Sequence, residues 1–264
     1  MTIKNARKGI SCAIAVALAG LLALYFSNKI FPNEKGGSLM SILAYALPIA
    51  LAAIIIYATR RQKFHFYTAG TFKTVFTIGL IIPATACVYA VLSYLSGAYQ
   101  GQVSTMQIVG FAVYCLATGF FEEMIFRVLG QGYLMDGWNN EGQGPLGAII
   151  MASVIFGAVH FFNLIQQPTL VLSTIAQVGY SFALGFMLGV IFYKTQSLLS
   201  VALLHGLYNF IGSFSSLYST GAVAQVKDIA PNAILVSWVI MVPGLIISYL
   251  FFKGVYRSAS QQSL

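Results

Sequence analysis

Long stretches without a single charged residue constrain this chain more than any other feature. No Asp, Glu, Lys or Arg occurs in residues 10–28, 36–59 or 74–121. Over the whole chain 58% of residues are hydrophobic and 8% are charged, whereas soluble domains carry about 25% charged residues. A soluble protein of 264 residues has no core large enough to hide such helices. The sequence therefore predicts an all-α, polytopic membrane protein, with residues 1–264 forming one integral membrane domain.

Apolar stretches long enough to cross a bilayer recur along the chain. A spanning helix needs about 20 mostly apolar residues. We expect about eight transmembrane helices, at residues 10–30, 39–58, 74–95, 106–134, 146–163, 170–193, 198–216 and 233–252. The first stretch follows basic residues, as a signal peptide does, but no convincing small-residue cleavage site precedes a polar segment. We therefore expect an uncleaved first helix.

The cations favour one orientation for these helices. If the N-terminus lies inside, the inner segments hold ten cations, namely Lys4, Arg7, Lys8, Arg60, Arg61, Lys63, Lys73, Lys194, Lys253 and Arg257. The outer loops hold three, namely Lys29, Lys35 and Lys227. Cytoplasmic loops of membrane proteins carry an excess of Lys and Arg. The sequence thus predicts a cell-membrane protein with both termini in the cytoplasm. The net charge of +8 is then a feature of topology, and no nucleic-acid partner is expected.

A few strongly polar side chains lie well inside the predicted spans. They are Glu122, Glu123, Arg127, His160, His205 and Asn209. A charged side chain at the centre of a membrane helix costs about 2.5–3.5 kcal/mol on insertion scales. Such residues usually face the bundle interior and mark a functional site. These six residues are therefore the predicted site.

Helical geometry separates the two adjacent carboxylates. Glu123 and Arg127 are four residues apart and share a helix face, which favours an ion pair. Glu122 lies about 140° around the helix from Arg127 and faces elsewhere. Adjacent carboxylates in a low dielectric raise the proton affinity of at least one of them, as a general base requires. We predict Glu122 as the base, and a purely structural ion pair is the alternative role for Glu123 and Arg127.

The remaining polar residues suit hydrolysis. His205 and Asn209 are four residues apart and share a face, so both can donate hydrogen bonds to the oxyanion of a peptide carbonyl. Glu122 can deprotonate a water that His160 helps to hold. We expect no cofactor. The alternative is zinc, which two histidines and a glutamate can bind with a position left open for water, although the helical HExxH motif is absent.

Three short motifs resemble those of one family. EEMIFR at residues 122–127, FGAVH at 156–160 and HGLYN at 205–209 are similar to the EExxxR, FxxxH and HxxxN/D motifs of the CPBP family. This family, also called Abi, contains CAAX proteases and bacteriocin-processing proteins. The motifs occur in the family's order, and the resemblance covers roughly residues 105–215. One departure is Val128, because the family motif commonly has glycine directly after its arginine.

The resemblance implies an eight-helix intramembrane endopeptidase related to the type II CAAX prenyl protease. It implies that Glu122 and His160 activate water, that His205 and Asn209 stabilise the oxyanion, and that Glu123 and Arg127 support the site. The expected substrate is a peptide at the bilayer, either membrane-tethered or hydrophobic. Prenylated C-termini and bacteriocin leader peptides both occur as substrates linked to the family, and the sequence does not choose between them. It also leaves the oligomeric state open.

Two functions of other classes compete with proteolysis. One is a non-catalytic membrane scaffold or bacteriocin self-immunity protein that uses the same fold. The other is a transporter in which Glu122 and the histidines relay protons. The sequence shows no repeated hydropathy pattern and no pair of broken helices, which transporters commonly have. The four predicted catalytic residues also occur together, which a scaffold does not require.

Overall fold

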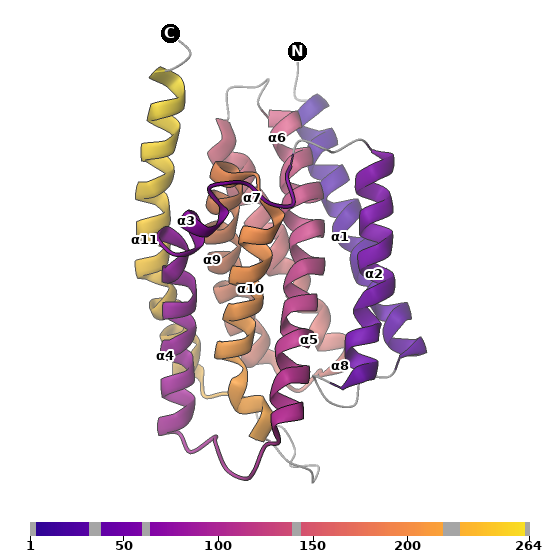
Figure 1. Cartoon of the computed structure of the whole chain (residues 1–264), viewed down its shortest axis with the longest axis vertical. Helices are drawn as coiled ribbons and strands as arrows, with labels where there is room; N and C mark the ends of the chain where they lie inside the picture. The colour runs from indigo at the N-terminus through magenta and orange to yellow at the C-terminus, as the bar shows by residue number, and fades with distance from the viewer. Residues whose placement is uncertain (1–3, 32–37, 60–63, 139–143, 219–227, 262–264) are drawn as a thin grey trace.

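The computed structural model describes residues 4–31, 38–59, 64–138, 144–218 and 228–261, and all regular elements within these ranges are helices (Figure 1). The α-helices are α1 (Lys4–Ile30), α2 (Leu39–Ala58), α3 (Thr71–Val75), α4 (Ile81–Leu95), α5 (Thr105–Glu123), α6 (Gly132–Trp138), α7 (Gly144–Ala158), α8 (Asn163–Gln166), α9 (Val171–Thr195), α10 (Leu198–Gly212) and α11 (Pro231–Gln261). A π-helix covers Met124–Gln131, and 3₁₀ turns cover Ile78–Leu80, Val159–Phe162 and Phe214–Tyr218. The long helices form one bundle, and the chain ends lie at the same end of it (Figure 1).

The membrane-protein fold is confirmed, with one change to the expected helices. In the described ranges seven helical stretches are long and apolar enough to cross a membrane, at Asn5–Ile30, Leu39–Ala58, Ile78–Leu95, Thr105–Trp138, Gly144–Gln166, Val171–Thr195 and Pro231–Arg257. The expected span at residues 198–216 is shorter, because α10 ends at Gly212 and a 3₁₀ turn follows. α10 still runs inside the bundle, packed against α5 and α4 (Figure 1).

Other boundaries also differ from the prediction, since the first span begins at Asn5 and the last ends at Arg257. The expected span at residues 74–95 begins at Ile78, because α3 forms a separate short helix before it. The expected span at 106–134 continues to Trp138 through the π-helix. Five cations used for the orientation argument lie outside the described residues, namely Lys35, Arg60, Arg61, Lys63 and Lys227.

Burial identifies the helix at the centre of the bundle. Of the α9 window that qualifies as a membrane span, 67% is buried by the rest of the protein, compared with 17% for α11. Large apolar side chains on the outer helices remain exposed, including Phe26 on α1, Ile54 on α2 and Leu235 on α11. A helix that is apolar on its outer side is suited to lipid contact. Several polar residues of the predicted site therefore line a cavity beside the most buried of these spans.

Local sequence signals fix where the site helices begin. The Ser104 hydroxyl accepts from the backbone N–H of Gln107, and the Gln107 side chain accepts from the backbone N–H of Ser104, which forms a capping box at the start of α5. At the start of α10 the Ser197 hydroxyl accepts from the backbone N–H of Ser200. Before it, Gln196 ends α9 in the left-handed conformation, with φ of 50°. These helix starts determine the positions of Glu122 along α5 and of His205 along α10.

Two glycines bring α5 and α10 close together. A Cβ atom on Gly119 would lie 2.8 Å from the backbone nitrogen of Gly206 and 2.9 Å from the carbonyl oxygen of Ala202. Both distances are shorter than van der Waals contact, so only glycine fits at this crossing. Gly119 lies one turn before the glutamates, and Gly206 follows His205 directly. The close crossing therefore places the histidine beside both carboxylates.

Candidate active site

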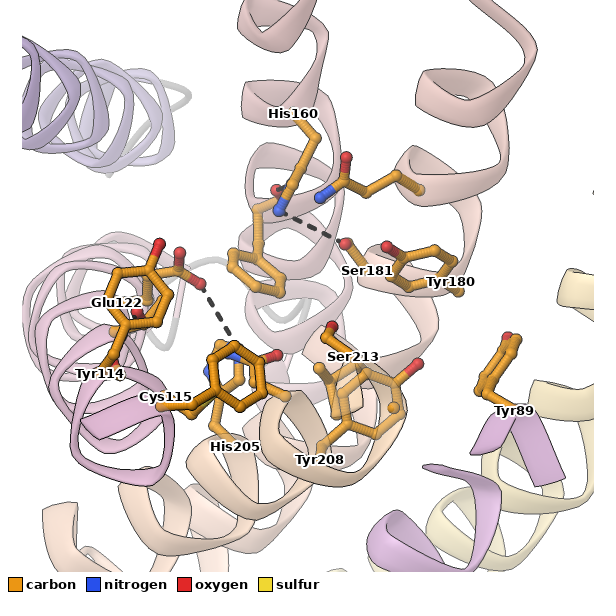
Figure 2. Close-up of a pocket in the computed structure, with 17 residues that line it drawn as sticks. Tyr89, Tyr114, Cys115, Glu122, His160, Tyr180, Ser181, His205, Tyr208 and Ser213 are labelled. Carbon is orange, nitrogen blue, oxygen red and sulfur yellow. Dashed lines mark hydrogen bonds and ion pairs between the residues drawn. The ribbon is translucent and has the colours of Figure 1, made fainter. Parts of the chain in front are cut away.

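Four of the six predicted site residues line one cavity of about 320 Å³ in the middle of the bundle (Figure 2). They are Glu122 from α5, His160 from the turn after α7, and His205 and Asn209 from α10. They are separated by up to 87 positions in the sequence, so folding alone gathers them. The arrangement agrees with the prediction that these side chains share one site.

The two adjacent carboxylates have different surroundings. The Glu122 side chain is 20% exposed and lines the cavity, whereas the side chains of Glu123 and Arg127 are 0% exposed. Arg127 Nε lies 3.0 Å from Glu123 Oε2, so these two residues form the ion pair that their spacing predicts. The Arg127 guanidinium carbon also lies 5.1 Å from the centre of the Phe156 ring, at cation–π distance. Glu122 is thus the carboxylate that can reach a substrate.

His205 joins the carboxylates to each other. Its Nδ1 lies 2.8 Å from Glu123 Oε1. Its Nε2 lies 3.4 Å from Glu122 Oε2 (Figure 2). An ionised carboxylate only accepts hydrogen bonds, so Nδ1 carries the proton toward Glu123. Nε2 therefore points to Glu122 and the cavity. The sequence argument did not foresee this contact, because helix spacing alone says nothing about distances between α5 and α10.

His160 is held by other partners. Its Nδ1 lies 2.9 Å from the Phe156 carbonyl oxygen, one turn earlier, and its Nε2 lies 3.5 Å from the Ser181 hydroxyl of α9 (Figure 2). A carbonyl oxygen only accepts, so Nδ1 carries a proton and Nε2 is the acceptor in the neutral ring. The Phe156 ring also contacts the rings of both histidines edge-on, with centroids 5.2 Å from His160 and 5.7 Å from His205. Phe156 therefore restricts the orientation of both imidazole rings.

The helix changes form directly after the glutamates. The sequence predicts a regular α-helix here, but the segment Met124–Gln131 is a π-helix, and all of its residues are buried. Such segments are uncommon and often occur at functional sites. The ion pair between Glu123 and Arg127 spans the boundary between the two helix forms, since Glu123 ends α5 and Arg127 lies within the π-helix. The hydrophobic pattern is the same for both helix forms at this length, so the sequence did not reveal the change.

Tyrosines form the wall of the cavity away from the carboxylates. The rings of Tyr89, Tyr180 and Tyr208 contact one another, with centroids 6.0 to 6.5 Å apart. The Tyr89 hydroxyl donates a hydrogen bond of 2.6 Å to the carbonyl oxygen of Ser237 on α11. The wall ties α4, α9, α10 and α11 together and gives the cavity an aromatic surface with polar groups. It was not predicted, because tyrosines in apolar spans are also typical of ordinary helix contacts.

Two further cavities adjoin the first. One, of about 290 Å³, also contains Glu122 and His160 in its lining and extends between apolar side chains of α1 and α2, such as Leu21 and Tyr45. The other, of about 380 Å³, lies among α8, the start of α9 and the residues between them, and polar side chains dominate its wall. α8 lies at the end of the bundle away from the chain termini (Figure 1). The site is therefore bordered by one apolar and one polar space.

The arrangement of possible metal ligands is limited. Within the described part of the chain, no group of three or more His, Cys, Asp or Glu side chains is placed to hold a metal ion. Both nitrogens of His160 and both nitrogens of His205 already lie near polar partners. Chelation and metal analysis of active protein test the zinc alternative.

Other cavity residues were not among the predicted ones. Ser181 contacts His160, and Gln177 lines the cavity one turn earlier on α9. A signal for both was present, because Gln177 and Ser181 are four residues apart and place two polar groups on one face of a mostly apolar helix.

Comparison with known families agrees with this geometry. Residues 104–211 match the family described as "Rce1-like: Type II CAAX prenyl endopeptidase Rce1-like". This match supports assignment of the chain to the CAAX protease family. The matched segment runs from the cap of α5 into α10 and contains all six predicted site residues. Comparison with curated proteins gives no match.

The family match indicates the general activity. The match supports a multi-pass membrane protein and, at the level of the family, an intramembrane protease. Most of the residues that line the cavity with Glu122 lie within the matched segment.

Proposed function

We propose that the chain hydrolyses a peptide bond in a membrane-associated or hydrophobic peptide and that Glu122 is the general base. The observation that carries this proposal is the shared cavity: the side chains of Glu122, His160, His205 and Asn209 all line it, while Glu123 and Arg127 are buried behind it. The partly exposed carboxylate can reach a water molecule. The fully buried carboxylate cannot.

The first step activates water. Glu122 takes a proton from a water molecule that His160 Nε2 helps to orient, since Nδ1 is held by the Phe156 carbonyl. The water oxygen then forms a bond to the carbon of the scissile carbonyl, and the carbonyl oxygen becomes the oxyanion. When the intermediate breaks down, the carbon–nitrogen bond cleaves and the proton on Glu122 passes to the leaving amine.

His205 connects the general base to the oxyanion. When His205 carries a proton on both nitrogens, Nδ1–H donates to Glu123 and Nε2–H points toward Glu122. When Glu122 takes a proton it loses its negative charge, and Nε2–H is free to donate to the oxyanion together with the Asn209 amide. The negative charge thus passes from the Glu122 carboxylate to the carbonyl oxygen of the substrate. The hydrogen-bond donors for this oxyanion, on His205 and Asn209, are already in place.

The role of Glu123 follows from the same contacts. It does not line the cavity, so we assign it as a positioning residue that sets which nitrogen of His205 faces Glu122. Arg127 neutralises Glu123 and allows a carboxylate to remain buried. No metal takes part in this proposal.

We further infer that the protein lies in the cell membrane with both termini in the cytoplasm. Both termini lie at one end of the bundle (Figure 1). This supports the even number of crossings that the distribution of cations predicts.

The test is a cleavage assay with purified protein in lipid nanodiscs. A library of peptides made from a digested proteome is incubated with wild type or with Glu122→Gln, and new peptide ends are identified by mass spectrometry. The proposal predicts cleavage by wild type and a loss of at least about 10²-fold in Glu122→Gln. Equal cleavage by both proteins would overturn the role of Glu122.

A further inference from the structure

Gln177 lies where three cavities meet. It lines the cavity of about 320 Å³ that holds the proposed catalytic residues, the apolar cavity of about 290 Å³, and the polar cavity of about 380 Å³ beside α8. We call the last of these the amide vestibule, because its wall contains the amides of Asn163, Gln166, Gln167 and Gln177. Gln177 is the one described residue that the linings of all three cavities share.

The vestibule has a specific chemistry. Its other polar lining residues are Ser173, Thr174 and Tyr180, and none of the described side chains in its lining is charged. The Asp228 carboxylate is already bonded to the Ser173 hydroxyl, and among the described lining residues a phosphate or an acidic peptide side chain would find no counter-ion. Amides and hydroxyls instead both donate and accept, as a peptide backbone does.

Asn163 and Gln177 form a hydrogen-bonded pair in the wall of the vestibule. Asn163 Nδ2 donates a hydrogen bond of 2.9 Å to Gln177 Oε1. After this bond the pair retains the Asn163 Oδ1 atom as an acceptor and the Gln177 Nε2 group as a donor. One acceptor and one donor on neighbouring side chains match the N–H and C=O of an extended backbone.

The position of Gln177 relates this pair to the site. Ser181 lies one turn further along α9 and contacts His160 Nε2 at 3.5 Å. A peptide backbone bound at Gln177 therefore lies one turn along α9 from Ser181, which contacts His160. His160 is the histidine that we propose orients the water molecule.

We propose that Asn163 and Gln177 form a peptide-backbone subsite, which takes an extended, uncharged peptide segment from the amide vestibule and guides it to Glu122. This subsite rests on the proposed function, because it gives that reaction its substrate class. It predicts that substrates carry an uncharged stretch beside the scissile bond, while the adjoining apolar cavity takes apolar side chains.

Binding without turnover tests the subsite. The probe is the capped peptide acetyl-Ala-Ser-Leu-Ala-Ser-amide, measured by calorimetry against full-length Glu122→Gln in lipid nanodiscs, with empty nanodiscs as the blank. Adding Gln177→Met removes the amide at nearly constant size, and we expect binding to weaken about tenfold. Gln102→Met is the matched control, since Gln102 is exposed and lines none of these cavities, and it should bind the probe normally.

A second measurement does not depend on how the Gln177 variant folds. The same peptide N-methylated at its backbone nitrogens loses its N–H donors, and it should bind unaltered Gln177 protein about tenfold more weakly than the parent peptide. The subsite is refuted if the parent peptide does not bind, if Gln177→Met binds it normally, or if N-methylation has no effect. Because nothing is cleaved, peptide binding combined with no Glu122-dependent proteolysis would refute the proposed function and leave the subsite standing.

Discussion

Glu123 holds His205 through a hydrogen bond of 2.8 Å between two side chains that are both almost fully buried. This bond directs the opposite nitrogen of the imidazole toward Glu122, 3.4 Å away. The second carboxylate of the pair thus acts on the first through the histidine.

Replacing Glu123 by Gln tests this positioning. The amide keeps the shape but removes the charge that favours the proton on Nδ1 of His205. We expect kcat to fall about 10²-fold with little change in KM, because Glu123 does not line the cavity. Steady-state kinetics on folded protein of equal abundance provide the measurement. A variant with wild-type kcat would mean that the contact is only structural.

The crossing of α5 and α10 leads to a stability prediction. In Gly119→Ala the new methyl group meets backbone atoms of α10 at 2.8 and 2.9 Å, so the helices must separate. Overpacking of this kind costs about 1–3 kcal/mol, and activity should fall as well because His205 moves from the glutamates. Gly70→Ala is the control, since a Cβ atom there has no neighbour within 4 Å. Thermal unfolding in detergent compares the two, and equal midpoints would contradict a close crossing.

Asp228 gives a prediction for pH. It lies before α11 and accepts hydrogen bonds at the start of α9 from the backbone N–H groups of Leu172 and Ser173 and from the Ser173 hydroxyl, at 2.6 to 2.7 Å. Partial desolvation opposes its ionisation, but the Ser173 hydroxyl and the backbone donors, including that of Ile229, outweigh this effect and lower its pKa from 3.8 to about 2.

The sign of the pH effect follows from this lowered pKa. The folded state holds the ionised form more tightly than the unfolded state does, so the stabilisation is present above pH 3.8 and is lost as the pH falls through about 2. Asp228→Asn should therefore unfold at a lower temperature than wild type at pH 7. The difference should begin to shrink below pH 4. Midpoints that differ equally at pH 7 and pH 3 would show that the charge of Asp228 is not responsible.

Chelation distinguishes the two forms of water activation. If Glu122 alone activates water, a strong chelator leaves the cleavage rate unchanged and metal analysis finds far less than one ion per chain in active protein. Loss of activity on chelation, restored by added zinc and accompanied by about one bound ion, would support the zinc alternative.

The sequence predicted most of the helices, and four residues that the structure brings to one cavity, for physical reasons that can be named. Charge-free runs identify spans because lipid excludes charge, and the spacing of Glu123 and Arg127 predicts their ion pair because neighbours on a helix face lie close. Contacts between helices were not predictable in this way. The contact of His205 with both glutamates depends on the helix crossing at Gly119 and Gly206. A glycine in a sequence does not indicate which helix packs against it. The π-helix after Glu123 was missed because it leaves no distinct apolar pattern.

The most direct test of the central claim is made in cells. New protein and peptide N-termini in the membrane and secreted fractions are compared between cells carrying wild type and cells carrying Glu122→Gln at equal abundance. The amide keeps the shape of the side chain and removes the base, so a scaffold would be largely unaffected. We predict a set of termini that is present with wild type and absent with Glu122→Gln, which would also name the substrates. Identical termini, together with a wild-type phenotype of the mutant, would contradict proteolysis at Glu122.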